Sequence, residues 1–263
     1  MPSPRRFVAL VDRLQNEHPH ITDPVAAIAA GAIRVDGAVM TNPRGLVRRD
    51  SALSVARPGS PRGAPKLRAA FEAFGGPTAG AVALDVGAST GGFTAELLAW
   101  GVARVYAVDA GHGQLLGSLR QDRRVINLER TNLGDLSRDV VPDVLGLVTI
   151  DVSYVSLATA IPQVSRSVDL GGEARLVALV KPMFELGLAR PPDTEVVLTA
   201  ALERAVGGME AAGWMVSQTM RSPALGRHGA IEFLVHAHWA GPWCDLSPSD
   251  GPGQGAEGTG WGR

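Results

Sequence analysis

Lysine is almost absent from this chain of 263 residues, which contains two lysines and 23 arginines. Arginine has replaced lysine wherever a positive surface charge is sufficient, so Lys66 and Lys181 are candidates for chemistry that arginine cannot perform. A lysine can lose its proton when it is desolvated or lies near other cations, whereas arginine stays charged. The alternative is a codon bias that left two lysines by chance.

Cysteine and long apolar runs are also scarce, and each absence excludes a class of protein. The single cysteine, Cys244, excludes an internal disulfide and is typical of the reducing cytosol. No run of about 18 apolar residues occurs, which argues against a membrane span, and no apolar segment follows the first six residues as in a signal peptide. The six histidines are scattered without metal-ligand spacing. We therefore expect a cytoplasmic protein with no membrane partner and no metal.

The charge of the chain is unevenly distributed although its sum is −1. Residues 1–66 carry ten basic and five acidic side chains, whereas residues 67–263 carry fifteen and twenty-one. A small basic module ahead of an acidic one indicates delivery to a polyanion, and it weakly favours nucleic acid.

The basic module has the pattern of a small α/β domain over residues 1–56, followed by a linker over 57–66. A helix is predicted over residues 5–17, and a second one follows a cap at Thr22 or Asp23 and ends at Gly31. The runs 33–35 and 38–40 flank Asp36-Gly37 and predict a hairpin. This order resembles the S4 RNA-binding fold, and the alternative is a generic small module. The candidate RNA contacts are Arg5, Arg6, Arg13, Arg34, Arg44, Arg48, Arg49 and Arg62.

Strands and helices alternate over residues 67–240 and predict a second domain. Helices are expected over 67–74, 93–100, 114–119, 156–168 and 194–212. Strands are expected over 81–86, 104–108, 125–128, 145–150 and 175–180, and near 214–220 and 231–238. Such alternation predicts a mostly parallel sheet covered on both faces. Because the last two strands are consecutive, they favour an antiparallel final hairpin and a Rossmann-like methyltransferase sheet. The glycine- and proline-rich residues 241–263 are predicted to be disordered.

A glycine-rich turn between a strand and a helix is typical of a nucleotide-like cofactor site. The turn comprises Asp85, Gly87, Ala88, Ser89, Thr90, Gly91, Gly92 and Phe93. Its glycines allow the backbone to approach a ligand closely. Asp109 ends the next strand, where a carboxylate can accept both ribose hydroxyls, although it could also only cap the strand end. The turn is not Gly-x-Gly-x-x-Gly, so it favours S-adenosylmethionine over NAD.

Four charged residues are predicted to meet above the carboxyl edge of the sheet. Asp151 and Lys181 each follow a strand, at the edge where open α/β sheets bind ligands. Glu232 lies among apolar neighbours, so it should have a buried cationic partner unless its strand is an edge strand that faces water. Lys66 is the fourth member of the group.

Seven motifs occur in the order found in one known family. They are Arg62-Gly63-x-x-Lys66-Leu67, Leu84-Asp-x-Gly-Ala-Ser-Thr-Gly-Gly-Phe-Thr94, Gly113-Gln114-Leu115, Leu128-Glu-Arg-Thr-Asn132, Asp151-x-Ser-x-x-Ser156-Leu, Val180-Lys-Pro-x-Phe-Glu185 and Ile231-Glu232-Phe. In these motifs, over about residues 5–239, the chain resembles the TlyA family, whose members join an S4 domain to an FtsJ-like ribose methyltransferase domain.

The resemblance implies methyl transfer from S-adenosylmethionine to the 2′-hydroxyl of cytidine in ribosomal RNA, with ribosomal RNA or ribosomal subunits as partner. It implies that Lys66, Asp151, Lys181 and Glu232 form a catalytic tetrad. It further implies cofactor contacts outside the turn, from Ala110, Gln114, Asn132 and Asp151.

Three segments depart from the usual pattern of the family, and all three concern substrate recognition. The second predicted helix begins without basic residues, Met183 replaces a glutamine, and residues 223–229 replace a Pro-Gly-Pro segment. Two alternatives therefore stay open. One is a diverged enzyme that methylates another RNA or a small nucleoside-like metabolite, and the other is a ribosome-binding factor without catalytic activity.

Overall fold

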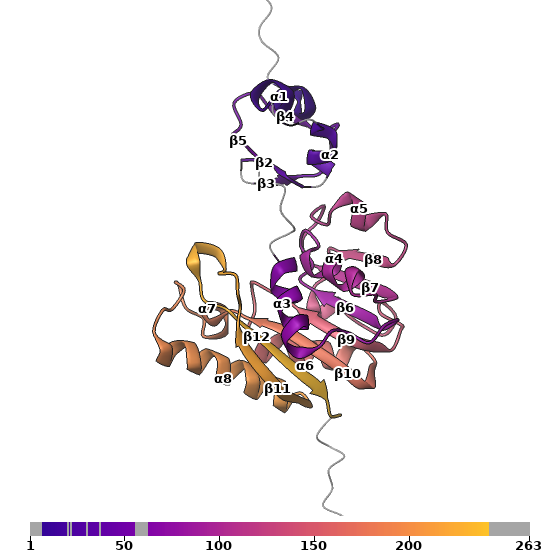
Figure 1. The fold of residues 1–263 in the computed structure, drawn as a ribbon, viewed down its shortest axis with the longest axis vertical. Coiled ribbons are helices and arrows are strands. Elements are labelled where there is room, and N and C mark those ends of the chain that lie inside the picture. The colour runs from indigo at the N-terminus through magenta and orange to yellow at the C-terminus, as the bar shows by residue number, and fades with distance from the viewer. Residues whose placement is uncertain are drawn as a thin grey trace, which may run out of the picture.

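The computed structural model describes residues 7–19, 21, 23–29, 31–36, 38–55 and 63–241 (Figure 1). Several predictions fall outside these residues: the RNA contacts Arg5, Arg6 and Arg62, residues 57–62 of the linker, the cap candidate Thr22, and the tail beyond Gly241. The side chain of Arg34 is also not described.

The N-terminal part contains two helices, α1 (Leu10–Glu17) and α2 (Pro24–Ala29), and two small sheets. The predicted first helix was too long, because Phe7–Ala9 forms strand β1 and pairs antiparallel with β4 (Leu46–Arg48). The predicted hairpin is present as β2 (Ile33–Val35) and β3 (Ala38–Met40), and β5 (Leu53–Val55) pairs with the other edge of β2. Strands β4 and β5 were not predicted.

A separate hydrophobic core holds this N-terminal part together. Leu10 and Leu14 lie one helical turn apart on α1 and are fully buried, as is Ile28 of α2. They pack with Ile33 and Val47 from the two sheets. The spacing of four residues places the two leucines on one face of α1, and burying that face attaches the helix to the strands.

The larger part is a seven-stranded sheet in the order β11-β12-β10-β9-β6-β7-β8. Its first three strands in the chain are β6 (Val82–Val86), β7 (Arg104–Asp109) and β8 (Val125–Glu129), and β7 pairs in parallel with both β6 and β8. The strand β9 (Leu145–Ile150) lies on the other side of β6 and is parallel to both β6 and β10 (Leu170–Val180). The predicted parallel sheet is confirmed.

The chain ends its sheet with β11 (Trp214–Arg221) and β12 (Phe233–Trp239), which pair antiparallel as predicted. The last strand, β12, lies between β10 and β11 and runs antiparallel to both. Because β12 is an inner strand, the residue that precedes it, Glu232, does not lie on the outer edge of the sheet.

Helices cover both faces of the sheet (Figure 1). One core contains side chains of α3 (Ala64–Phe74) and α4 (Gly92–Ala99), including Leu67, Phe71 and Leu97. The other core contains side chains of α6 (Leu157–Ser167) and α8 (Glu195–Ala211), including Ile161 and Leu198. The inner strands of the sheet are therefore buried on both faces, as their apolar runs require, whereas most of the edge strand β11 is exposed.

Several predicted boundaries differ from the structure. The helix predicted from residue 67 begins at Ala64, so Lys66 lies in its first turn and not in a linker. The helix predicted over 114–119 is α5 (Gly117–Arg120), and β10 begins five residues earlier than predicted. A one-turn helix, α7 (Pro182–Glu185), was not predicted. In the described part of the chain, no helix is long and apolar enough to cross a membrane.

Candidate active site at the carboxyl edge of the sheet

The glycine-rich turn connects β6 to α4 through backbone conformations that favour glycine. Gly87 has φ +87° and Gly91 has φ +94°, and even Ser89 lies in the left-handed region at φ +49°. A β-carbon on Gly87 would stand 2.4 Å from the carbonyl oxygen of Asp151. Glycine is therefore required at this position, where the turn touches the segment that follows β9.

The predicted turn residues separate into an accessible and a buried group. Gly87, Ser89 and Thr90 keep some exposure, whereas Ala88, Gly91, Gly92 and Phe93 are buried. The Phe93 ring, at the start of α4, packs in the core together with side chains of α3. A β-carbon on Gly92 would stand 3.0 Å from the backbone of Gly63, just before α3. The buried group thus attaches the turn to the helix that bears Lys66.

Asp85 lies inside the protein and not on the open edge of the sheet. Its carboxylate is fully buried and accepts hydrogen bonds from the hydroxyls of Thr94 (2.6 Å) and Thr149 (3.0 Å). Burial raises the pKa of Asp85 to about 7, although both hydroxyls oppose that rise. Both oxygens of this predicted cofactor ligand thus bind neighbouring elements and connect β6 with α4 and β9.

Asp109 connects the turn to the loop that follows β7. Its two carboxylate oxygens accept hydrogen bonds from the backbone N–H groups of Ser89 (2.8 Å) and Gly111 (2.6 Å). The Ser89 hydroxyl lies 3.1 Å from the Gln114 side-chain oxygen. A carboxylate has about four acceptor positions, so both oxygens of Asp109 can still accept a ligand hydroxyl. Ala110 beside it is exposed.

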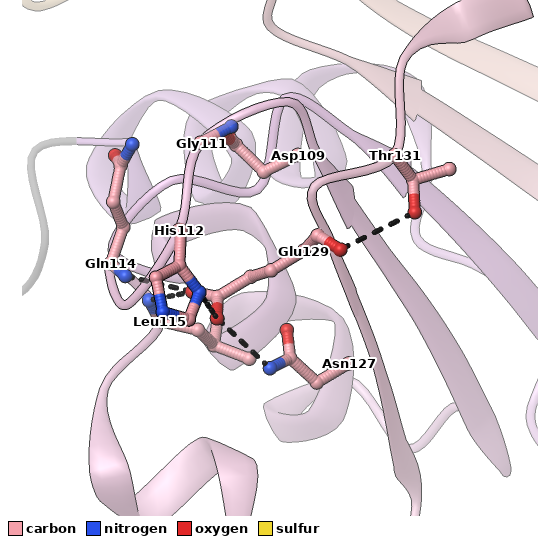
Figure 2. A network of polar contacts seen from close by, with 8 residues as sticks. All are labelled: Asp109, Gly111, His112, Gln114, Leu115, Asn127, Glu129 and Thr131. Atoms are coloured by element: carbon pink, nitrogen blue, oxygen red, sulfur yellow. Dashed lines mark hydrogen bonds and ion pairs between the residues drawn. The ribbon is translucent and has the colours of Figure 1, made fainter. Parts of the chain in front are cut away.

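Glu129, at the end of β8, also binds the loop that follows β7 (Figure 2). One of its oxygens accepts hydrogen bonds from the backbone N–H groups of Gln114 (2.7 Å) and Leu115 (3.0 Å). The other oxygen lies 3.3 Å from the Asn127 side-chain nitrogen and 3.8 Å from His112 Nδ1.

The charge of Glu129 is stabilised in this position. Burial alone would raise the pKa of Glu129, but backbone N–H groups of Leu115, Gly113 and Gln114, with the Asn127 side chain, lower it to about 2. Glu129 was not among the site residues predicted from the sequence. The available signal was its place at a strand end within the Leu128–Asn132 motif.

Asn132, the last residue of that motif, is the N-cap of a short 3₁₀-helix, η1 (Leu133–Asp135). Its backbone N–H donates to the Asp135 carboxylate (2.9 Å), and its side-chain nitrogen lies 3.2 Å from the same oxygen. The side chain is exposed, so the structure places Asn132 in a capping box at the sheet edge.

The four charged residues form two ion pairs. Lys66, in the first turn of α3, contacts Glu232, and both side chains are buried. Lys181 Nζ lies 2.5 Å from Asp151 Oδ1 and donates a hydrogen bond to the Ser153 hydroxyl (2.6 Å). In each pair one lysine neutralises one carboxylate, which offsets the cost of removing both charges from water.

Strand register brings the two pairs to the same edge of the sheet. Val180 lies opposite Phe233, so Lys181 and Glu232 are the next residues along β10 and β12. Ala178 lies opposite Ile150, so Asp151 stands beside the end of β10. Three neighbouring strands thus deliver three of the four charges, and α3 brings Lys66 over them.

The segment from Asp151 to Ser156 begins at the residue that both pairs with Lys181 and touches Gly87 of the turn. Its Tyr154 side chain is exposed, although partial burial raises the pKa of the Tyr154 hydroxyl, and the negative charge of Asp109 raises it further. The segment borders both the turn and the lysine–carboxylate pairs.

The predicted RNA contacts of the N-terminal part differ in availability. Arg13 is largely buried, and it donates hydrogen bonds to Glu17 (2.6 Å) and to the Arg48 carbonyl (2.9 Å). Arg48 pairs with Asp50. Arg44 and Arg49 are exposed. Among the described residues no cluster of histidine, cysteine, aspartate or glutamate could hold a metal ion.

The fold and the site together define a class. An inner antiparallel last strand in an otherwise parallel core, with a glycine turn at its carboxyl edge, is the arrangement of a Rossmann-like, S-adenosylmethionine-dependent methyltransferase. The family described as FtsJ-like methyltransferase matches residues 60–239.

Relatives extend the match to most of the chain. The 16S/23S rRNA (cytidine-2′-O)-methyltransferase TlyA of Mycobacterium tuberculosis is 40% identical over 217 residues, which are 79% of this chain and 80% of the relative. Hemolysin A of Brachyspira hyodysenteriae is 32% identical over 220 residues, 80% of this chain and 90% of the relative. A solved structure from Streptococcus thermophilus, of a protein called a hemolysin, has a TM-score of 0.66 at 29% identity and covers 88% of each chain. The chain belongs to the FtsJ-like methyltransferase family and, within it, to the group that includes TlyA.

Proposed function

We propose that this protein transfers a methyl group from S-adenosylmethionine to the 2′-hydroxyl of a cytidine in ribosomal RNA. The observation that carries the proposal is the Lys181–Asp151 pair, held at the end of β9 and β10 where Gly87 of the turn touches Asp151. The TlyA relative is named for this reaction. The partner of the present protein would be ribosomal RNA or a ribosomal subunit in the cytoplasm.

The turn and the loop after β7 have the chemistry that a nucleoside cofactor requires. The free acceptor positions of Asp109 suit ribose hydroxyls, and the backbone at Gly87 permits close approach. We propose that Gly87, Ser89, Thr90, Ala110 and Gln114 line the site, whereas Asp85 and the buried turn residues shape it from behind. S-adenosylmethionine, when bound, supplies an activated methyl group.

The two ion pairs would act on the ribose hydroxyl, which is a poor nucleophile at neutral pH. We propose that Lys181 activates it, either as a neutral amine that accepts its proton or as a cation that stabilises the developing alkoxide. Asp151 and Ser153 hold the amine in place. Lys66 and Glu232 would orient the ribose beside it, so that the oxygen lies in line with the methyl group.

A small nucleoside-like substrate is the second candidate. The observation that favours it is the engagement of Arg13 and Arg48 in contacts within the protein, which reduces the positive charge left for phosphates. RNA affinity depends strongly on such charges, and phosphate-led binding weakens steeply with salt.

Labelled methyl transfer tests the proposal directly. Purified protein is incubated with labelled S-adenosylmethionine and, in parallel, with ribosomal subunits, total RNA and free nucleosides, and digested products are identified by mass spectrometry. We expect 2′-O-methylcytidine in ribosomal RNA and subunit binding that weakens with added salt. Labelled nucleosides without labelled RNA would support the second candidate, and cofactor binding without any transfer would support a non-catalytic role.

Replacing Glu129 by glutamine should weaken S-adenosylmethionine binding about tenfold. The amide keeps one acceptor oxygen but loses the charge, and hydrogen bonds to charged groups contribute about 1.5–3 kcal/mol against about 1 kcal/mol for neutral ones. The loop from Gly111 to Leu115 would then no longer be fixed beside Asp109. Isothermal titration calorimetry measures the effect.

The matched control is Asp122→Asn, since Asp122 binds Arg124 and the Arg124 backbone near the same strand without contacting the loop. It should leave cofactor affinity unchanged. Equal affinity in the Glu129 variant and the wild type would show that the loop does not need this carboxylate.

A further inference from the structure

Glu185 is a buried carboxylate at the end of α7 that the proposed reaction does not use. Its two oxygens accept hydrogen bonds from the backbone N–H groups of Leu157 (2.7 Å) and Ala158 (3.1 Å). Ser156 occupies the N-cap of α6, but its hydroxyl lies 3.0 Å from the Thr159 hydroxyl and does not cap the helix. Glu185 therefore caps α6 from a different segment of the chain.

The same residue is bonded to the backbone of Lys181. The Glu185 backbone N–H donates to the Lys181 carbonyl (3.0 Å), because α7 is a single turn that begins directly after Lys181. One residue thus connects the backbone of the lysine to the first turn of α6. Glu185 makes both attachments itself, one through its side chain and the other through its backbone N–H.

The segment between β9 and α6 completes a closed ring of contacts. It is attached at one end where the Asp151 N–H donates to the Val86 carbonyl (2.9 Å), and at the other end where Glu185 holds Leu157. Between these ends, Asp151 and Ser153 contact the Lys181 amine. The ring therefore runs from the Lys181 amine through this segment to α6, and through Glu185 back to the Lys181 backbone.

We propose that Glu185 is a positioning residue, which sets the place of the Lys181 amine relative to Asp151 by holding α6 and α7 together. The inference rests on the proposed role of Lys181. A displacement of about 1 Å in a reacting group can cost about 100-fold in rate. Glu185 acts through Lys181 and touches neither the turn nor Asp109.

The test combines kinetics with a spectroscopic view of the lysines. The full chain contains two lysines, so lysine labelled with ¹³C at Cε gives two side-chain resonances. In Glu185→Gln, we expect a turnover about 100-fold lower at saturating S-adenosylmethionine and an unchanged Kd for it. The Lys181 resonance should shift while the Lys66 resonance stays. Glu185→Asp, which keeps the charge but is one methylene shorter, should move both readouts in the same direction.

Asp143→Asn is the matched control, because Asp143 binds Tyr106 and Arg104 at the opposite edge of the sheet. It should lower the thermal midpoint without moving either resonance. Normal turnover and an unmoved Lys181 resonance in both Glu185 variants would overturn the proposal, and so would failure of both to fold, since Glu185 would then serve the domain as a whole. If the wild type methylates no RNA, the resonances still decide whether Glu185 positions Lys181.

Discussion

Replacing Lys181 by arginine is expected to reduce methyl transfer by at least about 100-fold, the lower end of what a positioned acid or base contributes. Arginine keeps the positive charge, but its planar guanidinium cannot place one nitrogen 2.5 Å from Asp151 and 2.6 Å from the Ser153 hydroxyl. It also cannot accept a proton. Single-turnover rates at saturating S-adenosylmethionine measure the loss, and calorimetry should show unchanged cofactor affinity.

Arg138→Lys is the control for exchanging arginine and lysine elsewhere in the protein. Arg138 pairs with Asp169 in an exposed position away from the site. It should keep the wild-type rate. Full turnover in Lys181→Arg would show that a fixed positive charge is sufficient there, and it would remove the explanation offered for the survival of this lysine.

Removing one partner of the Lys66–Glu232 pair is expected to destabilise the protein by about 3–5 kcal/mol, because the other charge is left buried without compensation. Glu232→Gln and Lys66→Met are the two single variants. The double variant Lys66→Met/Glu232→Leu buries no charge, so it should recover most of the stability while methyl transfer stays abolished. Urea unfolding gives the free energies, and the transfer assay gives the activity.

The exposed pair of Arg221 and Glu195 is the natural comparison. Glu195→Gln should change stability little, because exposed ion pairs contribute little. If Glu232→Gln were equally mild, the Lys66–Glu232 pair would be open to water. If the double variant stayed as unstable as the single ones, the cost would lie in packing and not in charge.

Most of the sheet could be predicted from the sequence because several of its strands contain short, continuous apolar runs that end at glycines or polar turns. The run Val82–Val86, followed by Gly87, is the clearest example. The run 231–238 was predicted almost as fully, but Glu232 precedes β12 and does not lie within it. The position of β12 between β10 and β11 was not predicted, because the sequence indicated only an antiparallel final hairpin and left an edge strand open for Glu232.

The three-residue strands could not be predicted. Phe7–Ala9 is too short to show a period of two, and its partner Leu46–Arg48 is far away in the sequence. Because Phe7–Ala9 directly precedes a helical pattern, it was assigned to the predicted helix. Likewise, α7 is only one turn long, which is too short to show a helical period.

The candidate site, too, could be predicted only in part. Asp151 and Lys181 could be proposed because each follows a strand, Lys66 because lysine is scarce, and Glu232 because its neighbours are apolar. The sequence did not indicate which lysine pairs with which carboxylate. Glu129 and Glu185 escaped notice because their partners are backbone N–H groups, which every residue supplies. Asp85 was predicted to face the cofactor, although two threonine hydroxyls occupy its oxygens within the core.

The inner position of β12 determines when the site can be completed during synthesis of the chain. Lys66 and Glu232 are 166 residues apart in the sequence, and Glu232 reaches the site only when β12 inserts between β10 and β11. Contacts of such long separation form late in folding. While β12 is still inside the ribosomal exit tunnel, a nascent chain therefore holds Lys66 without its carboxylate. The site is completed only when synthesis of the domain is essentially finished.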